Sequence, residues 1–458
     1  MVYLWLLAAT LILEKLTILT STAFLTDHYE LTMLDALVQS GNVDSSAVFE
    51  VFVRELPLGI PFGVFAGSGT LAESIDKFTF TEDQLHFLSS KNLVSDDTVR
   101  WLSGYSFHGD ILAYREGELY FPNSPVMTIE GRLGEALILE TLILSILNHA
   151  SSIATAAARI AQAANGKYVM EAGSRRIHPE SAVHAARAAY LGGIDATSNL
   201  AAGLRWGIPT IGTASHAFTL AYSSESEAFN AQQEFIGSDS IFLVDTYDIV
   251  QGIQNAVEVT DGKLKGIRLD SGDLEAGAEI ARSLLDELGA KDAQIMVSGD
   301  LDEYRIQELR AAPIDAFESG HRLVTGSGAP SAGFVYKLVE IEDKLLARGQ
   351  MRAVAKTSKG KESVGGKKHA KRLLSNEAYA IKEILTSGPS AFDVPLKQNE
   401  RNLQAPLCIC GDFIDDWELN MARDHLQIRI EEIPKEIRLR KGGPPAIPTK
   451  YLQAEEAV

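Results

Sequence analysis

The sequence predicts an α/β protein whose central part is built from parallel strands. Seven short β-rich runs alternate there with stretches that have helical periodicity, which is the pattern of parallel βα units. The runs show little alternation of polar and apolar residues, as expected of strands buried on both faces. They favour an irregular α/β barrel, closed or nearly closed, with a doubly wound open sheet as the alternative. The runs cover residues 167–176, 193–199, 209–216, 240–248, 266–273, 294–304 and 313–320.

The segment before these runs has a mixed α+β pattern. Residues 27–41 carry apolar side chains at helical spacing, and residues 47–56 alternate as a half-buried strand does. Residues 109–121 are typical of a β-hairpin. Residues 131–149 predict a long apolar helix, followed by an Ala-rich helix over 151–165.

Composition limits the classes of partner. The chain has 458 residues and a formal net charge of −19, which argues against a nucleic-acid or anionic-membrane partner but allows one anionic substrate held by a few arginines. We expect the two cysteines, Cys408 and Cys410, to be reduced thiols, because a metal site needs more ligands than they offer. The apolar residues 1–13 are interpreted as part of an upstream extension, against a weak signal or an interfacial helix.

Charged or reactive side chains end most of the seven runs. In a parallel barrel the carboxyl ends of the strands meet on one face, where active sites are built. We therefore expect these residues to share one site. They are Arg175, Arg176, Asp195, Thr213, His216, Asp245, Arg268, Asp270, Asp273, Asp300 and Asp302.

Two strand ends carry the strongest local signals. Strand alternation places Arg268 and Asp270 on the same side, where the guanidinium can bind a carboxylate or phosphate at two points. The alternative is an Arg–Asp pair that closes a barrel layer. His216 follows small residues at the end of another run and is a candidate base or nucleophile, against a core histidine satisfied by a carbonyl.

Three further segments are suited to anions. Arg175 and Arg176 precede a helix predicted to begin near Pro179. Residues 324–333 form a Gly/Ser-rich loop after the last run, a common phosphate-binding position in barrels. Residues 356–372 are basic and predict a solvated loop or, alternatively, a mobile cover over an anionic ligand.

Several of these segments together resemble nicotinate phosphoribosyltransferases. The matching stretches run in the family's order from about Ser21 to about Ser375, whereas residues 1–20 lie outside them. The stretches read "FLTDHYELTM", "VFEVFVRELP", "GSRRIHPESA", "GIDATSNLAAGLRWGIP", "GTASHAFTL", "LVDTYD", "RLDSGDL", "DLDEY" and "LVTGSGAPSAGFVYKLV".

The resemblance implies a type II phosphoribosyltransferase fold, in which an irregular α/β barrel packs on an α+β sandwich. The expected division is an extension over 1–20, the sandwich over 21–125, the catalytic barrel over 126–330, and a segment over 331–458 that returns to the sandwich. The family is typically cytoplasmic and homodimeric. Neither a nucleic acid nor a membrane is expected as a partner.

The implied reaction joins nicotinate to 5-phosphoribosyl 1-pyrophosphate, with release of pyrophosphate and coupled hydrolysis of ATP in the presence of Mg²⁺. The resemblance makes His216 the residue phosphorylated by ATP, and places Asp270 and Asp273 near the ribose and Mg²⁺. The residues implied to contact nicotinate are Tyr29, Thr213 and Arg268. Those implied to contact phosphoribosyl pyrophosphate are Arg175, Arg176, Gly320, His321, Gly326, Ser327 and Gly328.

One short stretch departs from the family pattern. Where the family reads "GVGT" at the substrate phosphate, residues 318–321 read "ESGH", so that Glu318 replaces a glycine and His321 replaces a threonine. The departure keeps a second hypothesis open, a nucleotide-binding relative without activity. A third hypothesis is a related transferase that uses nicotinamide or quinolinate.

Overall fold

The computed structural model describes residues 21–345, 349–358, 363–388, 395–414 and 418–453. The predicted extension over 1–20 lies outside these ranges. The chain divides into two compact units, which are described separately. The first comprises Met1–Ser151, Ser331–Pro434 and Gly442–Val458, and the second comprises Ser152–Pro330 and Lys435–Lys441.

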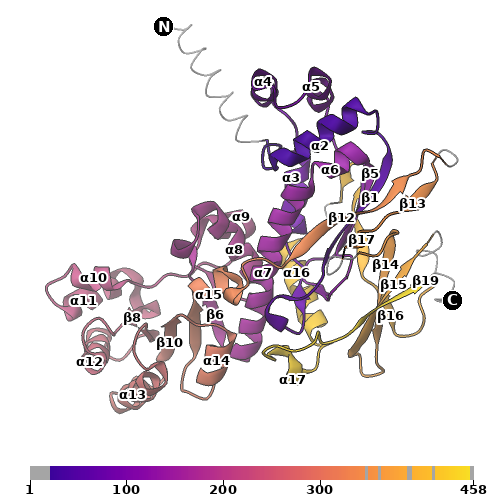
Figure 1. The fold of residues 1–458 in the computed structure, drawn as a ribbon. Coiled ribbons are helices and arrows are strands. Elements are labelled where there is room, and N and C mark those ends of the chain that lie inside the picture. Colours follow the sequence, from indigo (N-terminus) through magenta and orange to yellow (C-terminus); the bar gives the residue numbers. More distant parts are fainter. Residues whose placement is uncertain (1–20, 346–348, 359–362, 389–394, 415–417, 454–458) are drawn as a thin grey trace, which may run out of the picture. The chain divides into compact units, whose positions relative to one another are not determined.

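The first unit contains two larger sheets and a short one (Figure 1). The antiparallel seven-stranded sheet has the order β13 (Met351–Ala353), β12 (Phe334–Glu342), β1 (Ser46–Val53), β5 (Met127–Arg132), β3 (Asp110–Tyr114), β17 (Gln404–Ile409), β18 (Asp412–Phe413). The four-stranded sheet has the order β16 (Glu400–Asn402), β14 (Lys368–Leu374), β15 (Ala380–Ser387), β19 (Thr449–Gln453). The short sheet pairs β2 (Gly63–Val64) with β4 (Leu119–Tyr120).

Most helices of the first unit lie between these strands in the sequence, and in the described residues only α2 precedes them all. They are α2 (His28–Gln39), α3 (Ser68–Asp76), α4 (Glu82–Ser90), α5 (Asp96–Ser103), α6 (Leu133–Leu137) and α16 (Leu419–Ile430), with the 3₁₀ turn η1 (Pro57–Gly59). The predicted helix over 27–41 is α2, and Gly41 follows it with a positive φ of 66°, a conformation that suits glycine at the end of a helix.

The first segment of the first unit ends at residue 151, beyond the predicted boundary at residue 125. The reason is strand pairing, because β5 hydrogen-bonds to both β1 and β3 and therefore belongs to the first unit. The predicted hairpin over 109–121 is wrong. Its two halves form β3 and β4, which pair with different strands in different sheets.

Strand β1 is buried along almost its whole length, so the prediction of a half-buried strand is wrong. Its polar residue Glu50 is fully buried and pairs with Lys368 of β14, with 2.7 Å between Glu50 Oε2 and Lys368 Nζ. The alternation of polar and apolar residues therefore belongs to a strand that is buried on both faces, and the polar residue Glu50 is accommodated by an ion pair.

The basic run over 356–372 does not form a simple solvated loop in its described part. Lys368 and Arg372 lie in β14 and are buried, and Arg372 Nη1 is 2.8 Å from Glu118 Oε1. Residues 359–362 lie outside the described ranges, and the hypothesis of a mobile cover falls partly on them.

One continuous helix, α7 (Glu140–Ala164), replaces most of the two helices predicted over 131–165. Ser151 does not interrupt it, because its hydroxyl is satisfied by Ala66, accepting from the backbone N at 3.0 Å and donating to the carbonyl at 3.1 Å. The stretch Leu133–Ala164 is long and apolar enough to cross a membrane by composition alone, and 56% of its most apolar window is buried inside the protein. Partial burial of this kind is typical of a core helix.

The second unit is built on a parallel six-stranded sheet with the order β7 (Ala196–Thr197), β6 (Tyr168–Glu171), β11 (Ala316–Ser319), β10 (Gln294–Gly299), β9 (Gly266–Leu269), β8 (Ile241–Leu243). A parallel bridge from Thr197 to Thr210 adds the 209–216 run beyond β7. The pairing of β6 with β11 joins the first strand to the last, as barrel closure requires. In the described residues no ladder joins the 209–216 run to β8, so the barrel is irregular and open at that point.

Helices follow the strands around this sheet (Figure 1). They are α8 (Pro179–Leu191), α9 (Leu200–Trp206), α10 (His216–Leu220), α11 (Glu225–Ile236), α12 (Ile249–Thr260), α13 (Leu274–Glu287), α14 (Glu303–Leu309), α15 (His321–Val324) and α17 (Lys435–Arg438), with 3₁₀ turns η2 (Ser174–Arg176), η3 (Gly237–Asp239) and η4 (Gly326–Gly328). Helix α8 begins at the predicted Pro179.

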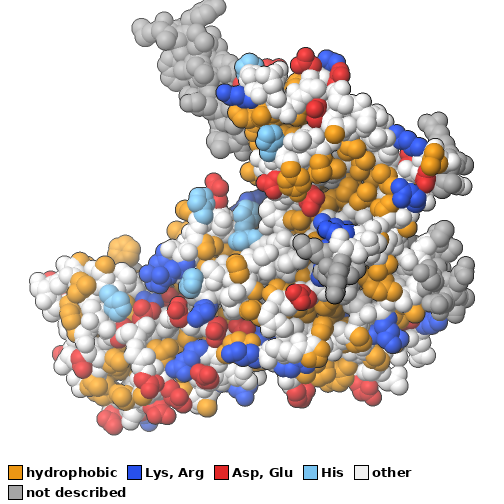
Figure 2. Space-filling view, viewed as in Figure 1, with side chains coloured by type: hydrophobic (Ala, Val, Ile, Leu, Met, Phe, Trp, Pro, Cys, Tyr) orange, Lys and Arg blue, Asp and Glu red, His pale blue; other side chains and the backbone are white. Residues whose placement is uncertain are grey.

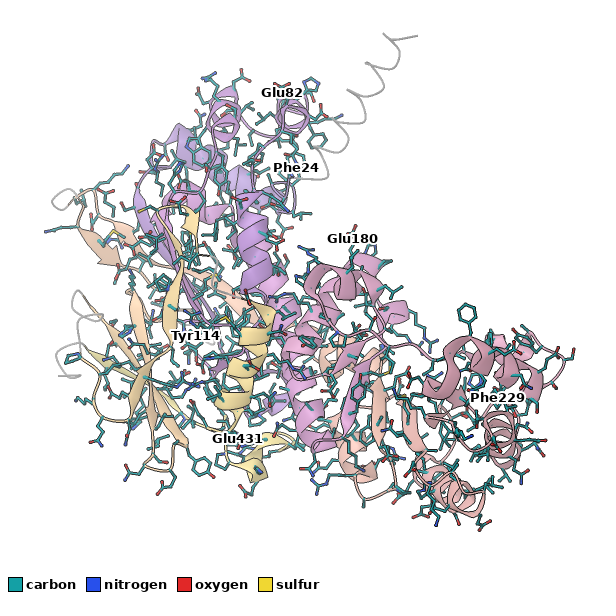
Figure 3. The ribbon with its side chains drawn as sticks, turned by 180° about the vertical axis from the view of Figure 1, so that it is seen from behind. Phe24, Glu82, Tyr114, Glu180, Phe229 and Glu431 are labelled. Atoms are coloured by element: carbon teal, nitrogen blue, oxygen red, sulfur yellow. The ribbon has the colours of Figure 1, made fainter. Side chains whose placement is uncertain are left out.

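Each unit has its own core. In the first, Tyr114 of β3 is fully buried with its ring centroid 6.4 Å from that of Phe65 (Figure 3). In the second, Phe229 of α11 packs on Phe242 of β8, with ring centroids 5.0 Å apart. The two cysteines are free thiols, Cys408 buried and Cys410 exposed.

Candidate active site

Parallel pairing brings the carboxyl ends of the barrel strands together. Strands β8, β9, β10 and β11 are hydrogen-bonded in this order, so the residues that follow them lie at one edge of the sheet. Figure 2 shows side chains of both charges mixed over the visible face of the second unit. Of the predicted strand-end residues, four contact one another: His216, Asp245, Arg268 and Asp270.

His216 is the first residue of α10 and lies between two carboxylates. Its Nδ1 is 3.1 Å from Thr246 Oγ1, and its Nε2 is 3.8 Å from Asp270 Oδ2 and 3.9 Å from Asp245 Oδ1. The side chain is 39% exposed, so the imidazole is not the satisfied core histidine of the alternative interpretation. Nε2 is too far from the carboxylates for a hydrogen bond and remains open to a reacting group.

Asp245 lies among the predicted strand-end residues, but the sequence assigned it no role. Its Oδ2 accepts hydrogen bonds from the Asp270 backbone N at 2.9 Å and from Ser271 Oγ at 2.6 Å. Its Oδ1 is buried without a hydrogen-bond partner among the described residues and faces His216 Nε2. The motif "LVDTYD", which contains Asp245 and ends a predicted strand, indicated that this residue belongs to the site. The motif did not indicate what Asp245 does there.

Arg268 is nearly buried and is held by β11 and by the segment that precedes α10. Its Nη1 donates to Glu318 Oε2 at 2.9 Å, and its Nη2 donates to the Ala214 carbonyl at 2.7 Å. Asp270 Oδ1 lies 3.9 Å from Nη1, so Arg268 and Asp270 face one space as alternation predicted. Nε is buried without a hydrogen-bond partner in the described part of the chain.

Glu318 and Glu171 place two carboxylates on neighbouring strands, β11 and β6. Glu171 is buried and accepts a hydrogen bond from Thr197 Oγ1 at 2.6 Å. Burial raises the pKa of Glu171, and the charge of Glu318 adds to the rise, whereas the bonds from Thr197 and the Gly173 backbone oppose it. The carboxylates nearest to the Arg268 guanidinium are those of Glu318, at 2.9 Å, and Asp270, at 3.9 Å.

Asp273, predicted to act with Asp270, is the N-cap of α13. Its Oδ1 accepts from the backbone N atoms of Glu275 at 3.1 Å and Ala276 at 3.2 Å, which satisfies the first turn of the helix. Its position after β9 matches the prediction, but its hydrogen bonds are those of a cap. The described residues contain no group of three or more His, Cys, Asp or Glu side chains arranged to hold a metal ion.

The predicted phosphate-binding residues lie on three adjoining segments. Turn η2 carries the exposed Arg175 and Arg176, and it contacts α15, which begins at His321 after Gly320. Helix α15 in turn contacts η4, formed by Gly326, Ser327 and Gly328. The structure thus brings together two arginines, a histidine and a glycine-rich turn, although the sequence places them about 150 residues apart.

Gly326 has a structural reason to be glycine. Its φ is 66°, and an added Cβ would lie 2.0 Å from Ser152 Oγ, which itself donates to the Ala329 carbonyl. Helix α7 therefore contacts the turn directly at this point.

The other two predicted nicotinate contacts are Thr213 and Tyr29. Thr213 is half-buried in the segment that leads to α10. Tyr29 lies on α2 in the first unit and is 47% exposed. The pKa of Tyr29 is raised by partial burial and by the charges of Glu140 and Glu30.

The second unit is an irregular parallel barrel with a histidine, an arginine and acidic residues at its strand ends. These features define the class of protein as an enzyme with the type II phosphoribosyltransferase fold. The model of the nicotinate phosphoribosyltransferase N-terminal domain matches residues 24–148, and that of the quinolinate phosphoribosyl transferase C-terminal domain matches residues 153–327.

Named relatives identify the family. A nicotinate phosphoribosyltransferase of Mycobacterium tuberculosis is 44% identical over 438 residues, covering 94% of this chain and 95% of the relative. That of Bacillus subtilis is 40% identical, covering 77% and 74%. The chain belongs to the nicotinate phosphoribosyltransferase family and is an enzyme of this type.

Solved structures share the fold. Human nicotinic acid phosphoribosyltransferase aligns with a TM-score of 0.79 at 24% identity, over 93% of this chain and 97% of the human one. Nicotinate-nucleotide pyrophosphorylase of Pyrococcus furiosus aligns with a TM-score of 0.73 at 26% identity, over 89% and 94%.

Proposed function

We propose that this enzyme transfers the 5-phosphoribosyl group from 5-phosphoribosyl 1-pyrophosphate to nicotinate, in the salvage route to NAD. The pyridine nitrogen attacks C1 of the ribose, the bond from C1 to the pyrophosphate oxygen breaks, and pyrophosphate leaves. Membership of the family and the position of Asp270, 3.8 Å from His216 Nε2 and 3.9 Å from Arg268 Nη1, carry the proposal. Arg268 supplies a positive charge for the nicotinate carboxylate, and Thr213 supplies a contact to its ring.

The same site supports coupling to ATP. His216 Nε2 attacks the γ-phosphorus of ATP, the bond from this phosphorus to the bridging oxygen breaks, and ADP is released. The product is a phosphohistidine, which water later hydrolyses to release phosphate. A proton on Nδ1, which lies 3.1 Å from Thr246 Oγ1, would keep the lone pair on Nε2. Asp245 and Asp270 would stabilise the positive charge that the ring gains.

Mg²⁺ fits this donor set as an ion bound chiefly through substrate phosphates. Mg²⁺ commonly takes one or two carboxylates and keeps oxygen ligands from phosphates and water. Asp270, one-third exposed at the end of β9, is the side chain placed to join it, and Asp273 stands beside it in the sequence with its Oδ1 used in capping. When bound, the ion would neutralise charge on the pyrophosphate leaving group.

The adjoining segments η2, α15 and η4 would bind phosphoribosyl pyrophosphate. Arg175 and Arg176 offer charge, His321 offers a donor in place of the family's threonine, and the turn 326–328 offers backbone N–H groups. We also propose a cytoplasmic homodimer, as in the family.

Product analysis tests the reaction. The purified chain is incubated with labelled nicotinate, phosphoribosyl pyrophosphate and Mg²⁺, with and without ATP, and nicotinate mononucleotide is measured. We expect product that increases with ATP. No product under either condition contradicts the proposal, and parallel reactions with nicotinamide and quinolinate distinguish the related transferases.

His216→Ala tests the ATP-coupled step. It should abolish nicotinate-dependent ATP hydrolysis and leave slow transfer without ATP. His86→Ala, at an exposed position of α4, is the matched control and should keep both activities. Unchanged ATP hydrolysis in His216→Ala contradicts the phosphohistidine.

A further inference from the structure

Glu318 contacts the arginine proposed to bind nicotinate. The family pattern has glycine at this position, and the resemblance places the position beside the substrate phosphate. In the structure the Glu318 carboxylate lies 2.9 Å from Arg268 Nη1, with only 14% of the Glu318 side chain and 10% of the Arg268 side chain exposed. Its direct partner is therefore the guanidinium of Arg268.

Both terminal nitrogens of the Arg268 guanidinium already donate hydrogen bonds within the protein. Nη1 donates to Glu318 and Nη2 donates to the Ala214 carbonyl, which leaves the buried Nε without a hydrogen-bond partner in the described residues. Asp270 is also close, at 3.9 Å from Nη1. A substrate carboxylate entering here meets one positive charge and two negative charges in a site where burial strengthens electrostatic interactions.

We propose that Glu318 determines the specificity of this enzyme for the pyridine substrate. By pairing with Arg268 it competes with the carboxylate of nicotinate, raises the KM for this anion, and narrows the preference for nicotinate over its neutral amide. The inference rests on the proposed function, because it requires transfer to a pyridine that carries a carboxylate or carboxamide.

Glu318→Gln is the direct test. Glutamine keeps the shape and an oxygen that accepts from Arg268, but it removes the competing charge. We expect the KM for nicotinate to fall about tenfold, as for the loss of roughly 1.4 kcal/mol of competition, and the KM for nicotinamide to stay the same or rise. The change should appear in KM rather than in kcat.

Glu308→Gln is the matched control, since Glu308 forms an exposed ion pair with Arg305 on α14. Its KM values should equal those of the unaltered enzyme. Thermal unfolding of each variant shows whether it is folded. If Glu318→Gln does not fold, Glu318→Gly, which has the residue of the family pattern, provides the same comparison.

The unaltered enzyme gives a measurement that needs no variant. An arginine free to bind the substrate carboxylate can discriminate against an analogue that lacks the group by about 10⁴-fold. With Glu318 as competitor we expect a preference in kcat/KM for nicotinate over nicotinamide below about 100-fold. A larger preference overturns the inference, as does a folded Glu318 variant in which the ratio of the two KM values is unchanged. Absence of turnover with every pyridine overturns the proposed function instead.

Discussion

Asp245 Oδ1 lies 3.9 Å from His216 Nε2 and has no hydrogen-bond partner among the described residues. The other oxygen of the same carboxylate accepts from the Asp270 backbone and from Ser271, which fixes its orientation. Asp245 thus places a buried negative charge next to the imidazole, and it leaves the nitrogen that faces it unblocked.

Asp245→Asn should therefore weaken the reaction of His216 with ATP. Asparagine keeps an acceptor for the Asp270 backbone but removes the charge that stabilises the imidazole as it becomes cationic. We expect nicotinate-dependent ATP hydrolysis to fall about 100-fold, measured as ADP release. ATP-independent transfer should change less, and Asp286→Asn, at a half-exposed position of α13, is the control. Equal losses in both reactions contradict this role.

Arg268→Lys tests the carboxylate contact. Lysine keeps the charge but cannot donate to Glu318 and Ala214 while also presenting a second N–H to the substrate. The KM for nicotinate should rise about tenfold to 100-fold, from the loss of a charged hydrogen bond. Arg282→Lys on α13 should leave KM unchanged, and a rise in KM of equal size for phosphoribosyl pyrophosphate contradicts a specific role with nicotinate.

Gly326→Ala should distort the turn at the proposed phosphate site. The new Cβ would displace the Ser152 hydroxyl, which lies 2.0 Å away, and break its bond to Ala329. Gly207→Ala is a closely matched control, because Gly207 has a φ of 67° and nothing within 4 Å of the new Cβ. Both should lose about 1 kcal/mol of stability from the backbone strain. Only Gly326→Ala should also raise the KM for phosphoribosyl pyrophosphate.

Lys368→Met should strongly destabilise the protein. It leaves Glu50 as an uncompensated charge in the core, which costs about 3–5 kcal/mol of unfolding free energy. Glu50→Gln combined with Lys368→Met should recover most of the loss, since glutamine still accepts from the Lys368 backbone N. Denaturant unfolding measures both. Arg305→Met breaks an exposed pair and should cost less than about 1 kcal/mol.

Glu171 predicts a dependence of stability on pH. Its pKa in the folded protein is raised above the ordinary value of 4.5, chiefly by burial. Between the two values the folded state keeps a proton that the unfolded state has lost, so this group lowers stability as pH rises through that window. At a pH above the raised pKa of Glu171, the Glu171→Gln variant should have a higher free energy of unfolding than the unaltered protein. This difference should shrink as the pH falls towards 4.5. A difference that does not vary with pH contradicts the prediction, and Glu308→Gln is the exposed control.

Local sequence patterns were enough to predict the class of fold and the set of strand-end residues. Patterns of apolar residues depend on neighbours within a few positions, and they correctly predicted helix α2 and the start of α8. Six of the seven barrel runs contain strands, and in the remaining run Thr210 forms a single bridge. The motifs around His216 and Arg268 determined the family for the same reason, because each is a short continuous stretch.

Which charged groups form pairs depends on the tertiary fold. Arg268 and Glu318 are 50 residues apart in sequence, and Glu50 and Lys368 are 318 apart. The pairing and register of strands set these contacts, and a local pattern does not contain that information. For this reason the sequence did not predict the contact of Glu318 with Arg268. It also predicted a solvent-exposed face for strand β1, whose two faces are both buried.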